Sequence, residues 1–309
     1  MLDYVLLIVG FVLLIKGADF FVDGSASVAK KLRVPTMIIG MTIVAMGTSA
    51  PECAVSIAAS VKGSNTMAIS NVIGSNIFNL MIVCGACALF TPLAVKVSTL
   101  KQEFPLSVLA AVLLLGMGYL GMSVNRVEGV ILLVIFALFL VWMVWEAKKA
   151  RDNAEVEEIE TLPGWKCLVY IVGGIIAIVI GGDLVVDCAS AIAAAFGLSQ
   201  TLIGLTIVAF GTSLPELVTS LVAAKKGETD MALGNVIGSN IFNILLVLAV
   251  AAAVSPMAVL MDNLIDDIIL IAVSILIWIF AWSKKELNRI HGVIMIVIYA
   301  AYVVYICMR

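Results

Sequence analysis

Charged side chains are scarce in this sequence. Asp, Glu, Lys and Arg together make up 13% of the 309 residues, whereas a typical soluble domain has about 25%. His291 is the single histidine, and the six cysteines show no disulfide framework. These shortages exclude an ordinary soluble protein and a metal site built from imidazole groups. Hydrophobic residues account for 63% of the chain and the mean hydropathy is +1.18, so the sequence predicts an integral membrane protein.

Long apolar runs fill most of the chain. A membrane-spanning helix needs about 20 largely apolar residues, and charged, proline or glycine positions divide the sequence into ten runs of about that length. A transmembrane β-barrel would show alternating segments of about ten residues. We therefore expect an all-α membrane protein with ten transmembrane helices, near residues 2–28, 34–61, 66–91, 102–121, 127–146, 166–195, 201–224, 231–254, 265–282 and 289–307.

Two pairs of matching blocks indicate an internal duplication. MTIVAMGTSAPE (41–52) matches LTIVAFGTSLPE (205–216) at nine of twelve positions, and SNVIGSNIFNL (70–80) matches GNVIGSNIFNI (234–244) at nine of eleven, both at an offset of 164 residues. Because each copy holds five spans, an odd number, the second copy must cross the membrane in the opposite sense. Inverted repeats are typical of secondary transporters. We expect two inverted five-helix repeats, at 1–148 and 165–309, joined by a cytoplasmic linker at 149–164.

The distribution of basic residues predicts the orientation. Cytoplasmic loops of membrane proteins retain Lys and Arg, and an external N-terminus places 14 of the 18 basic residues inside. Lys62 and Lys226, which are 164 residues apart, then lie on opposite sides. The opening segment MLDYVLL has no basic stretch, so we expect no cleavable signal peptide. These patterns predict a multi-pass protein of the cell (inner) membrane with both termini external.

Each copy places a glutamate, Glu52 or Glu216, inside an apolar span, where an ionisable group is costly and marks a functional site. Pro51 and Pro215 precede these acids, and a proline bends a helix and leaves a backbone carbonyl without its donor. Hydroxyl and amide side chains recur around both acids, and the groups shared by the two copies include no Cys, His or intramembrane Lys or Arg. Such oxygens are the hard ligands that Ca²⁺ takes. The sequence therefore predicts a site for a mobile cation.

The repeated GTSxPE and GSNIFN blocks resemble the two α-repeats of the calcium/cation antiporter superfamily, most closely its sodium/calcium exchanger branch, and the resemblance covers the whole chain. It implies Na⁺/Ca²⁺ antiport by alternating access, without a cofactor and without enzymatic activity. The short linker points to the prokaryotic type, because it cannot hold the calcium-sensing domains of animal exchangers. By this resemblance Glu52 and Glu216 bind Ca²⁺ centrally. The other ligands of Ca²⁺ and Na⁺ would be the side chains of Thr48, Ser49, Ser75, Asn79, Thr212, Ser213, Ser239 and Asn243 and the carbonyls of Ala45 and Ala209.

Ion choice and function class leave alternatives open. Potassium-dependent relatives carry Asp where this chain has Asn243, so we expect no K⁺ co-transport. Proton-coupled calcium exchangers usually show a different acidic motif, but H⁺ stays open as the coupling ion. A passive cation channel is the rival from another class, although channels commonly build their filters from oligomeric rings. A hydrolase with a serine nucleophile is disfavoured because Ser49 has no nearby His or Lys. An intramembrane protease with Glu52 and Glu216 as paired acids is disfavoured because the surrounding hydroxyls and freed carbonyls would have no role in it. No nucleic-acid partner is expected, and the oligomeric state is open.

Two groups of acids outside the repeated motifs are given other roles. Acids near span ends that recur at the offset of 164 are expected to be interfacial or helix-packing groups rather than cation ligands: Asp19, Asp23, Asp183 and Asp187. A second group is expected on a solvated loop at the outer surface: Asp262, Asp266 and Asp267.

Overall fold

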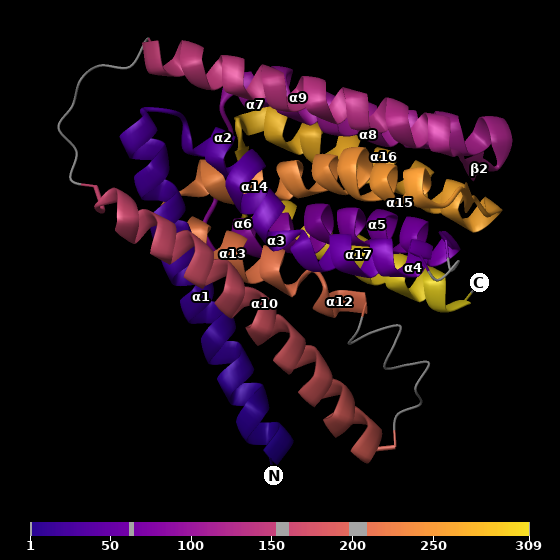
Figure 1. Cartoon of the computed structure of the whole chain (residues 1–309), viewed down its shortest axis with the longest axis horizontal. Helices are drawn as coiled ribbons and strands as arrows, with labels where there is room; N and C mark the ends of the chain where they lie inside the picture. Colours follow the sequence, from indigo (N-terminus) through magenta and orange to yellow (C-terminus); the bar gives the residue numbers. More distant parts are fainter. Residues whose placement is uncertain (1, 62–64, 153–160, 198–208, 309) are drawn as a thin grey trace.

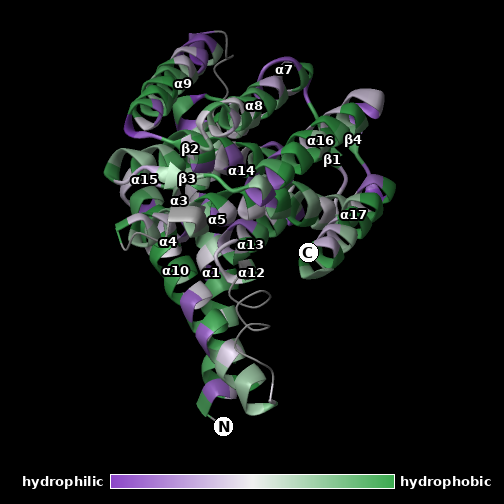
Figure 2. Cartoon of the chain, turned by 90° about the vertical axis from the view of Figure 1, so that its right-hand side faces the viewer, coloured by the Kyte–Doolittle hydropathy of each residue, from purple (hydrophilic) through white to green (hydrophobic). Residues whose placement is uncertain are grey.

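The computed structural model describes residues 2–61, 65–152, 161–197 and 209–308. Within these ranges, eight helices are long and apolar enough to cross a membrane. A ninth crossing consists of two helical stretches, Thr36–Thr48 and Ala50–Val61, bent by 49° at the break between them. The expected span at 201–224 lies partly outside the described residues. Figure 2 shows that most of the helical surface is hydrophobic, and the predicted all-α membrane fold is confirmed.

The first repeat contains two spans that are interrupted by π-helical turns, labelled η. In chain order its elements are α1 (Leu2–Leu32), α2 (Thr36–Ile39), η1 (Gly40–Val44), α3 (Ala45–Thr48), α4 (Ala50–Val61), α5 (Asn65–Phe78), η2 (Asn79–Val83), α6 (Cys84–Phe90), β1 (Leu93–Ala94), α7 (Val97–Lys101), α8 (Glu103–Gly121), β2 (Ser123–Val124) and α9 (Arg126–Asp152).

The second repeat follows the same plan. Its described elements are α10 (Gly164–Ala195), α12 (Ala209–Gly211), α13 (Leu214–Lys225), α14 (Thr229–Phe242), η4 (Asn243–Leu248), α15 (Ala249–Val254), β3 (Met257–Ala258), α16 (Met261–Lys284), β4 (Glu286–Leu287) and α17 (Arg289–Met308). Because α9 continues to Asp152, the first residues of the predicted linker are helical. The repeat boundaries themselves stay a prediction.

Two short strand pairs lie at opposite ends of the molecule and establish the inversion. β1 follows the third span of the first repeat and pairs with β4, which precedes the fifth span of the second repeat. β2 and β3 form the reciprocal pair. Since α8 crosses the membrane between β1 and β2, each end of the molecule holds the third-to-fourth connection of one repeat beside the fourth-to-fifth connection of the other. Repeats of the same orientation would place these connections at opposite ends, so the predicted inverted arrangement is correct.

The two longest helices, α1 and α10, cross each other on one side of the bundle (Figure 1). Glycines permit this crossing. A Cβ atom at Gly174 would lie 2.8 Å from the carbonyl oxygen of Gly17, and one at Gly181 would lie 2.8 Å from the carbonyl oxygen of Gly10. The two backbones are therefore in direct contact, as small residues permit between membrane helices.

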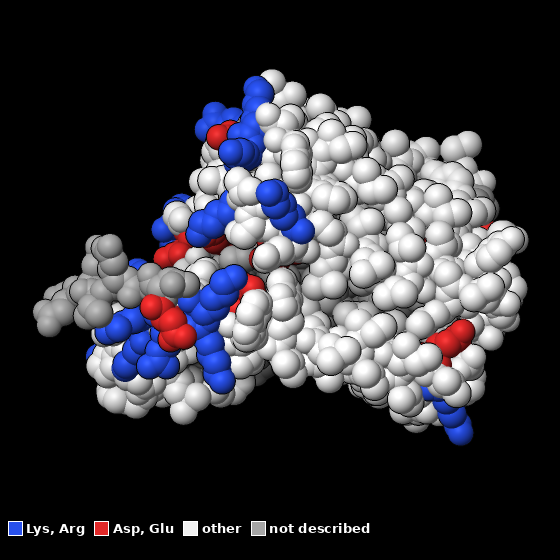
Figure 3. All heavy atoms as spheres, turned by 90° about the horizontal axis from the view of Figure 1, so that it is seen from above, with Lys and Arg blue, Asp and Glu red and all other residues white. Residues whose placement is uncertain are grey.

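The third span of each repeat forms the core. Every residue of α14 from Met231 to Phe242 is buried, and α5 with η2 and α6 occupies the equivalent place in the first repeat. Lys and Arg gather at one end of the molecule (Figure 3). We call this the basic end; it includes the β1–β4 pair, with Lys96 beside β1 and Lys285 bonded through its carbonyl to the amide of Val95.

Candidate cation-binding site

Helix breaks place the two glutamates inside the bundle. α3 ends at Thr48 and α4 begins at Ala50, so Pro51 lies in the first turn of a new helix, where its missing N–H leaves no bond unmade. In the second repeat α13 begins at Leu214 and carries Pro215 in its first turn. Glu52 and Glu216 are therefore also in the first turn of a helix, where the helix dipole favours negative charge.

The Glu52 carboxylate is fully buried and is held by both repeats. Its Oε1 accepts hydrogen bonds from Ser75 Oγ at 3.2 Å and from Ser213 Oγ at 3.1 Å. The two hydroxyl oxygens are themselves 2.9 Å apart. One carboxylate oxygen is thus fixed by a hydroxyl from its own repeat and a hydroxyl from the other.

The Glu216 carboxylate has an equivalent environment. It is also fully buried, and its Oε1 accepts a hydrogen bond from Ser49 Oγ at 2.9 Å. Ser49 and Ser213 are 164 residues apart, as are Glu52 and Glu216, so each serine donates to the glutamate of the opposite repeat. The two carboxylates lie close enough to repel each other, and a cation between them would relieve this repulsion.

Six buried oxygen atoms around these acids make no hydrogen bond within the described part of the chain. A buried polar atom without a partner is costly and rare in folded proteins. No cluster of three or more His, Cys, Asp or Glu side chains occurs among the described residues, so a bound cation must take neutral oxygens as well as the two acids. The six atoms are Glu52 Oε2, Glu216 Oε2, Asn79 Oδ1, Asn243 Oδ1, Thr212 Oγ1 and Ser239 Oγ.

An amide network fixes the two asparagine oxygens. The Nδ2 atoms of Asn76 and Asn240 each donate to the other residue's backbone carbonyl at 3.1 Å. Asn79 Nδ2 donates to Asn240 Oδ1 at 3.3 Å, and Asn243 Nδ2 donates to Asn76 Oδ1 at 3.1 Å. With their nitrogens engaged, Asn79 and Asn243 keep only their oxygens free. Both residues begin π-helical segments, which often occur at functional sites.

Comparison with known proteins identifies the family. The model of the sodium/calcium exchanger protein family matches residues 2–145 and 166–308. The chain belongs to this family. A solved structure of the sodium-calcium exchanger NCX_Mj, soaked with Na⁺ and Sr²⁺, superposes with a TM-score of 0.87 at 34% identity over 98% of each chain. The chain is therefore a membrane transporter of the exchanger family and not an enzyme.

Curated relatives of the exchanger chain are similar over nearly their whole length. The putative antiporter CaxA of Alkalimonas amylolytica is 43% identical over 96% of both chains. The sodium/calcium exchanger MaX1 of Methanosarcina acetivorans is 32% identical and covers 98% of this chain and 97% of its own. The inner membrane protein YrbG of Escherichia coli is 35% identical and covers 91% and 89%.

Two of the remaining predicted site residues of the exchanger, Thr48 and Ala45, have hydrogen-bond partners inside the protein. The Thr48 hydroxyl has two acceptors within hydrogen-bond distance, Val44 O at 3.1 Å and Asn235 Oδ1 at 3.0 Å. The Ala45 carbonyl accepts the backbone amide of Ser49 at 3.0 Å and also lies 3.3 Å from Thr48 Oγ1. Ala209 is the first residue of α12. The structure therefore links the predicted glutamates to serines of both repeats and joins the asparagines in a separate amide network, and the ligand assignments stay a prediction.

Two polar pairs of the exchanger were not anticipated from the sequence. Asn235 Nδ2 donates to Ser220 Oγ at 2.9 Å, and Asn71 Nδ2 donates to Ser56 Oγ at 3.1 Å. In each pair the serine lies one helical turn beyond a site glutamate on the same helix, because Ser56 and Ser220 each follow a glutamate by four residues. Their recurrence at the offset of 164 is the signal that would have identified them.

The expected solvated loop at Asp262, Asp266 and Asp267 is wrong for two of these acids. Asp266 and Asp267 are 5% and 1% exposed and lie within α16. Asn263, one turn earlier on α16, donates from Nδ2 to Ser70 Oγ of α5 at 2.9 Å, so this part of α16 is packed against the bundle. Glu103, 164 residues before Asp267, is also buried, so each repeat contains a second buried acid outside the network described above.

Proposed function

We propose that the chain exchanges Na⁺ for Ca²⁺ across the cell membrane by alternating access to a site at Glu52 and Glu216. The observation that carries the proposal is the pair of fully buried carboxylates, each with one oxygen bonded across the repeat boundary and one oxygen unpaired. Thr48, Ser49, Ser75, Asn79, their counterparts at the offset of 164, and the carbonyls of Ala45 and Ala209 supply the neutral ligands. Oxygen ligands of this kind suit both ions.

Charge competition would couple the two ions. The site has two formal negative charges, because Asn79 and Asn243 are neutral amides. One Ca²⁺ or two Na⁺ balance these charges. Binding both kinds of ion together would leave excess positive charge in a region of low dielectric, which is costly. Each ion therefore displaces the other, and the inverted repeats give the site two related access routes.

The basic end is proposed to face the cytoplasm, with both termini outside, because Lys and Arg are retained on that side. In a background without the six native cysteines, we expect a cysteine at Arg126 to react with an impermeant thiol reagent in intact cells. A cysteine at Lys101, which is exposed at the basic end, should react only after permeabilisation. Labelling of both positions from the same side would mean that α8 does not cross the membrane, and the reverse pattern of labelling would contradict the orientation.

Uptake of ⁴⁵Ca²⁺ into proteoliposomes tests the proposed exchange. Purified protein should accumulate Ca²⁺ when an outward Na⁺ gradient is imposed and should not respond to an outward K⁺ gradient. Uptake driven by a proton gradient and indifferent to Na⁺ would replace Na⁺ with H⁺ as the coupling ion. Ca²⁺ flux that needs no opposing cation would instead indicate a channel.

Asn243→Asp should change the ion dependence of transport. The substitution adds a third negative charge beside the two glutamates and replaces the amide that donates to Asn76. We expect an altered Na⁺ dependence or a new K⁺ dependence in the uptake assay. Asn125→Asp is the control, because Asn125 caps α9 through Oδ1, which an aspartate retains. Unaltered Na⁺, K⁺ and H⁺ dependence in the Asn243 variant would exclude this position from ion selection.

A further inference from the structure

Lys226 joins two helices at the basic end. It directly follows α13, the helix that carries Glu216 in its first turn. Its Nζ lies 2.6 Å from Asp19 Oδ1 and 2.6 Å from Asp23 Oδ1, and it also donates to the backbone carbonyl of Asp19 at 3.1 Å. Both acids belong to α1. One ammonium group therefore ties α1 to the end of a site helix.

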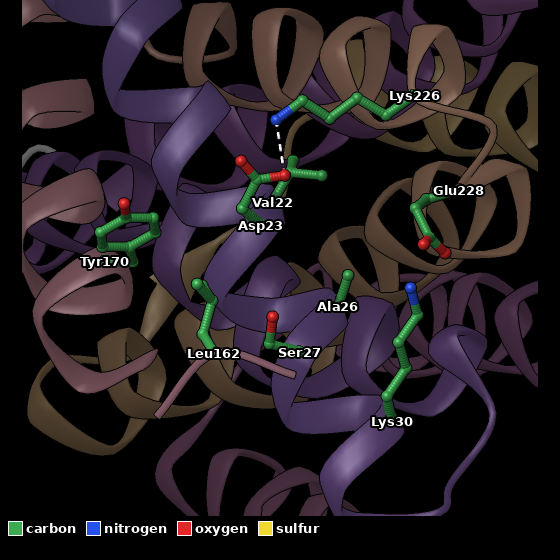
Figure 4. Close-up of a pocket in the computed structure, with 9 residues that line it drawn as sticks. All are labelled: Val22, Asp23, Ala26, Ser27, Lys30, Leu162, Tyr170, Lys226 and Glu228. Atoms are coloured by element: carbon green, nitrogen blue, oxygen red, sulfur yellow. Dashed lines mark hydrogen bonds and ion pairs between the residues drawn. The ribbon is translucent and has the colours of Figure 1, made fainter. Parts of the chain in front are cut away.

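The positive charge of Lys226 offsets the repulsion between Asp19 and Asp23. Asp19 and Asp23 are four residues apart in α1 and so lie on one helical face, where like charges repel. Figure 4 shows Lys226 reaching across to Asp23 beside a cavity of about 500 Å³. Burial lowers the pKa of Lys226, but the hydrogen bonds to Asp19 and Asp23 outweigh this effect and raise the pKa above its usual value. The lysine therefore stays charged in its place.

The equivalent acids of the other repeat are in a different environment. Asp183 and Asp187 of α10 lie 164 residues after Asp19 and Asp23, and they are exposed where the first pair is half-buried. Lys62, 164 residues before Lys226, lies outside the described residues. Two positions that the internal duplication makes equivalent thus differ in burial between the two ends of the molecule.

The polar pairs next to the glutamates also differ in burial, and again the residue near the basic end is the more buried one. Asn235, on the side of Lys226, is fully buried and accepts a hydrogen bond from Thr48. Its counterpart Asn71 is half-buried, and Thr212, the counterpart of Thr48, has no partner for its hydroxyl among the described residues. In both comparisons the described polar groups near the basic end are more covered than their counterparts in the other repeat.

We infer that Lys226 is a positioning residue that holds the transporter in the state closed at the basic end, by fixing Asp19 and Asp23 of α1 against the end of α13. The inference rests on the proposed alternating access. Opening at the basic end requires α1 and the end of α13 to separate, and all three contacts of Nζ break when they do. Loss of the lysine removes these contacts from the closed state only, so the balance shifts toward the open one.

The exposure of Lys226 limits how far its loss can change the ratio of the closed to the open state. Its side chain is 28% exposed, and partly exposed ion pairs are weak, although one ammonium here serves two acids. We expect Lys226→Gln to change the ratio of the two states by about three- to tenfold. Lys225→Gln is the matched control, since Lys225 is the adjacent, exposed residue and makes no ion pair with the described residues. Lys226→Arg keeps the charge and is the conservative variant.

Hydrogen–deuterium exchange of the purified full chain provides the first measurement, which requires no ion gradient. We expect Lys226→Gln to accelerate amide exchange in residues 19–30 and 219–228, while Lys225→Gln and Lys226→Arg resemble the parent protein. Equal exchange in Lys226→Gln and Lys225→Gln would overturn the inference. Because this measurement is independent of the transported ions, it remains valid if Na⁺/Ca²⁺ exchange is refuted.

The KM for the transported cation, measured separately at each face in oriented vesicles, provides the second measurement. Lys226→Gln should lower the KM at the basic end and raise it at the opposite face by about three- to tenfold in total, with Lys226→Arg restoring the parent ratio. A purely structural lysine would alter exchange but leave the ratio of the two KM values unchanged. That outcome would overturn the positioning role.

Discussion

Replacing Glu52 or Glu216 with Gln should abolish Ca²⁺ transport while leaving the protein folded. Each substitution removes half of the formal charge of the proposed site and keeps the side-chain volume. The glutamine Oε1 can still accept the serine hydrogen bonds that Glu52 and Glu216 accept, so the local packing is retained. Loss of a group that merely orients a metal ligand reduces metal affinity by about 10–100-fold, and loss of a charged ligand should cost at least as much.

The matched control for these variants is Glu103→Gln. Glu103 is also buried, but it takes no part in the hydrogen bonds that described residues make to the carboxylates of Glu52 and Glu216. Initial rates of ⁴⁵Ca²⁺ uptake should therefore fall in the two site variants and be kept in the control. Size-exclusion chromatography and thermal unfolding would verify that all three proteins fold. Near-normal uptake in either site variant would remove that glutamate from the mechanism.

Gly174→Val should disrupt the crossing of α1 and α10. A Cβ atom at Gly174 would lie 2.8 Å from both the Gly17 carbonyl oxygen and Phe21 Cβ, and backbone atoms cannot move aside as a flexible side chain can. Overpacking of this kind typically costs about 1–3 kcal/mol of the free energy of unfolding. We expect a lower midpoint of thermal unfolding and a lower yield of monodisperse protein.

Gly173→Val tests whether the effect comes from the contact or from a glycine substitution as such. Gly173 is the preceding residue of the same helix, is exposed, and has no described atom within 4 Å of an added Cβ. Its unfolding midpoint should stay within a few degrees of the parent value. If the two variants were equally stable, α1 and α10 would not be in backbone contact at Gly174.

The sequence predicted the features that depend on local chemistry. Pro51 and Pro215 indicated the helix breaks because a missing N–H acts within one turn, and the matching blocks indicated the inversion by counting spans. It could not predict which groups meet across the repeats. Ser49 bonds Glu216, 167 residues away, and no local periodicity contains such a pair. The reciprocal amide bonds of Asn76 and Asn240 were missed for the same reason.

The buried acids of α16 show a second limit of sequence reasoning. Asp266 and Asp267 follow Asp262, and three acids in six residues are typical of a solvated segment. Burial depends on which elements pack against a helix, and α16 packs against elements of the first repeat such as α5, where Asn263 bonds Ser70 from almost 200 residues away in the chain. Glu103 and Asp267 recur at the offset of 164 in the sequence. This recurrence would have argued against placing Asp267 on a solvated loop.

The reciprocal bonds between Asn76 and Asn240 identify a point of the molecule that need not move. Each asparagine bonds the other's carbonyl in the same way, so exchanging the two repeats maps this contact onto itself. Suppose that each repeat takes up the conformation of the other. Contacts that differ between the two repeats then change, whereas the bonds between Asn76 and Asn240 stay the same. If access alternates as proposed, the asparagine pair keeps its contacts in both states, and its backbone amides should be among the slowest in the described part of the chain to exchange with solvent.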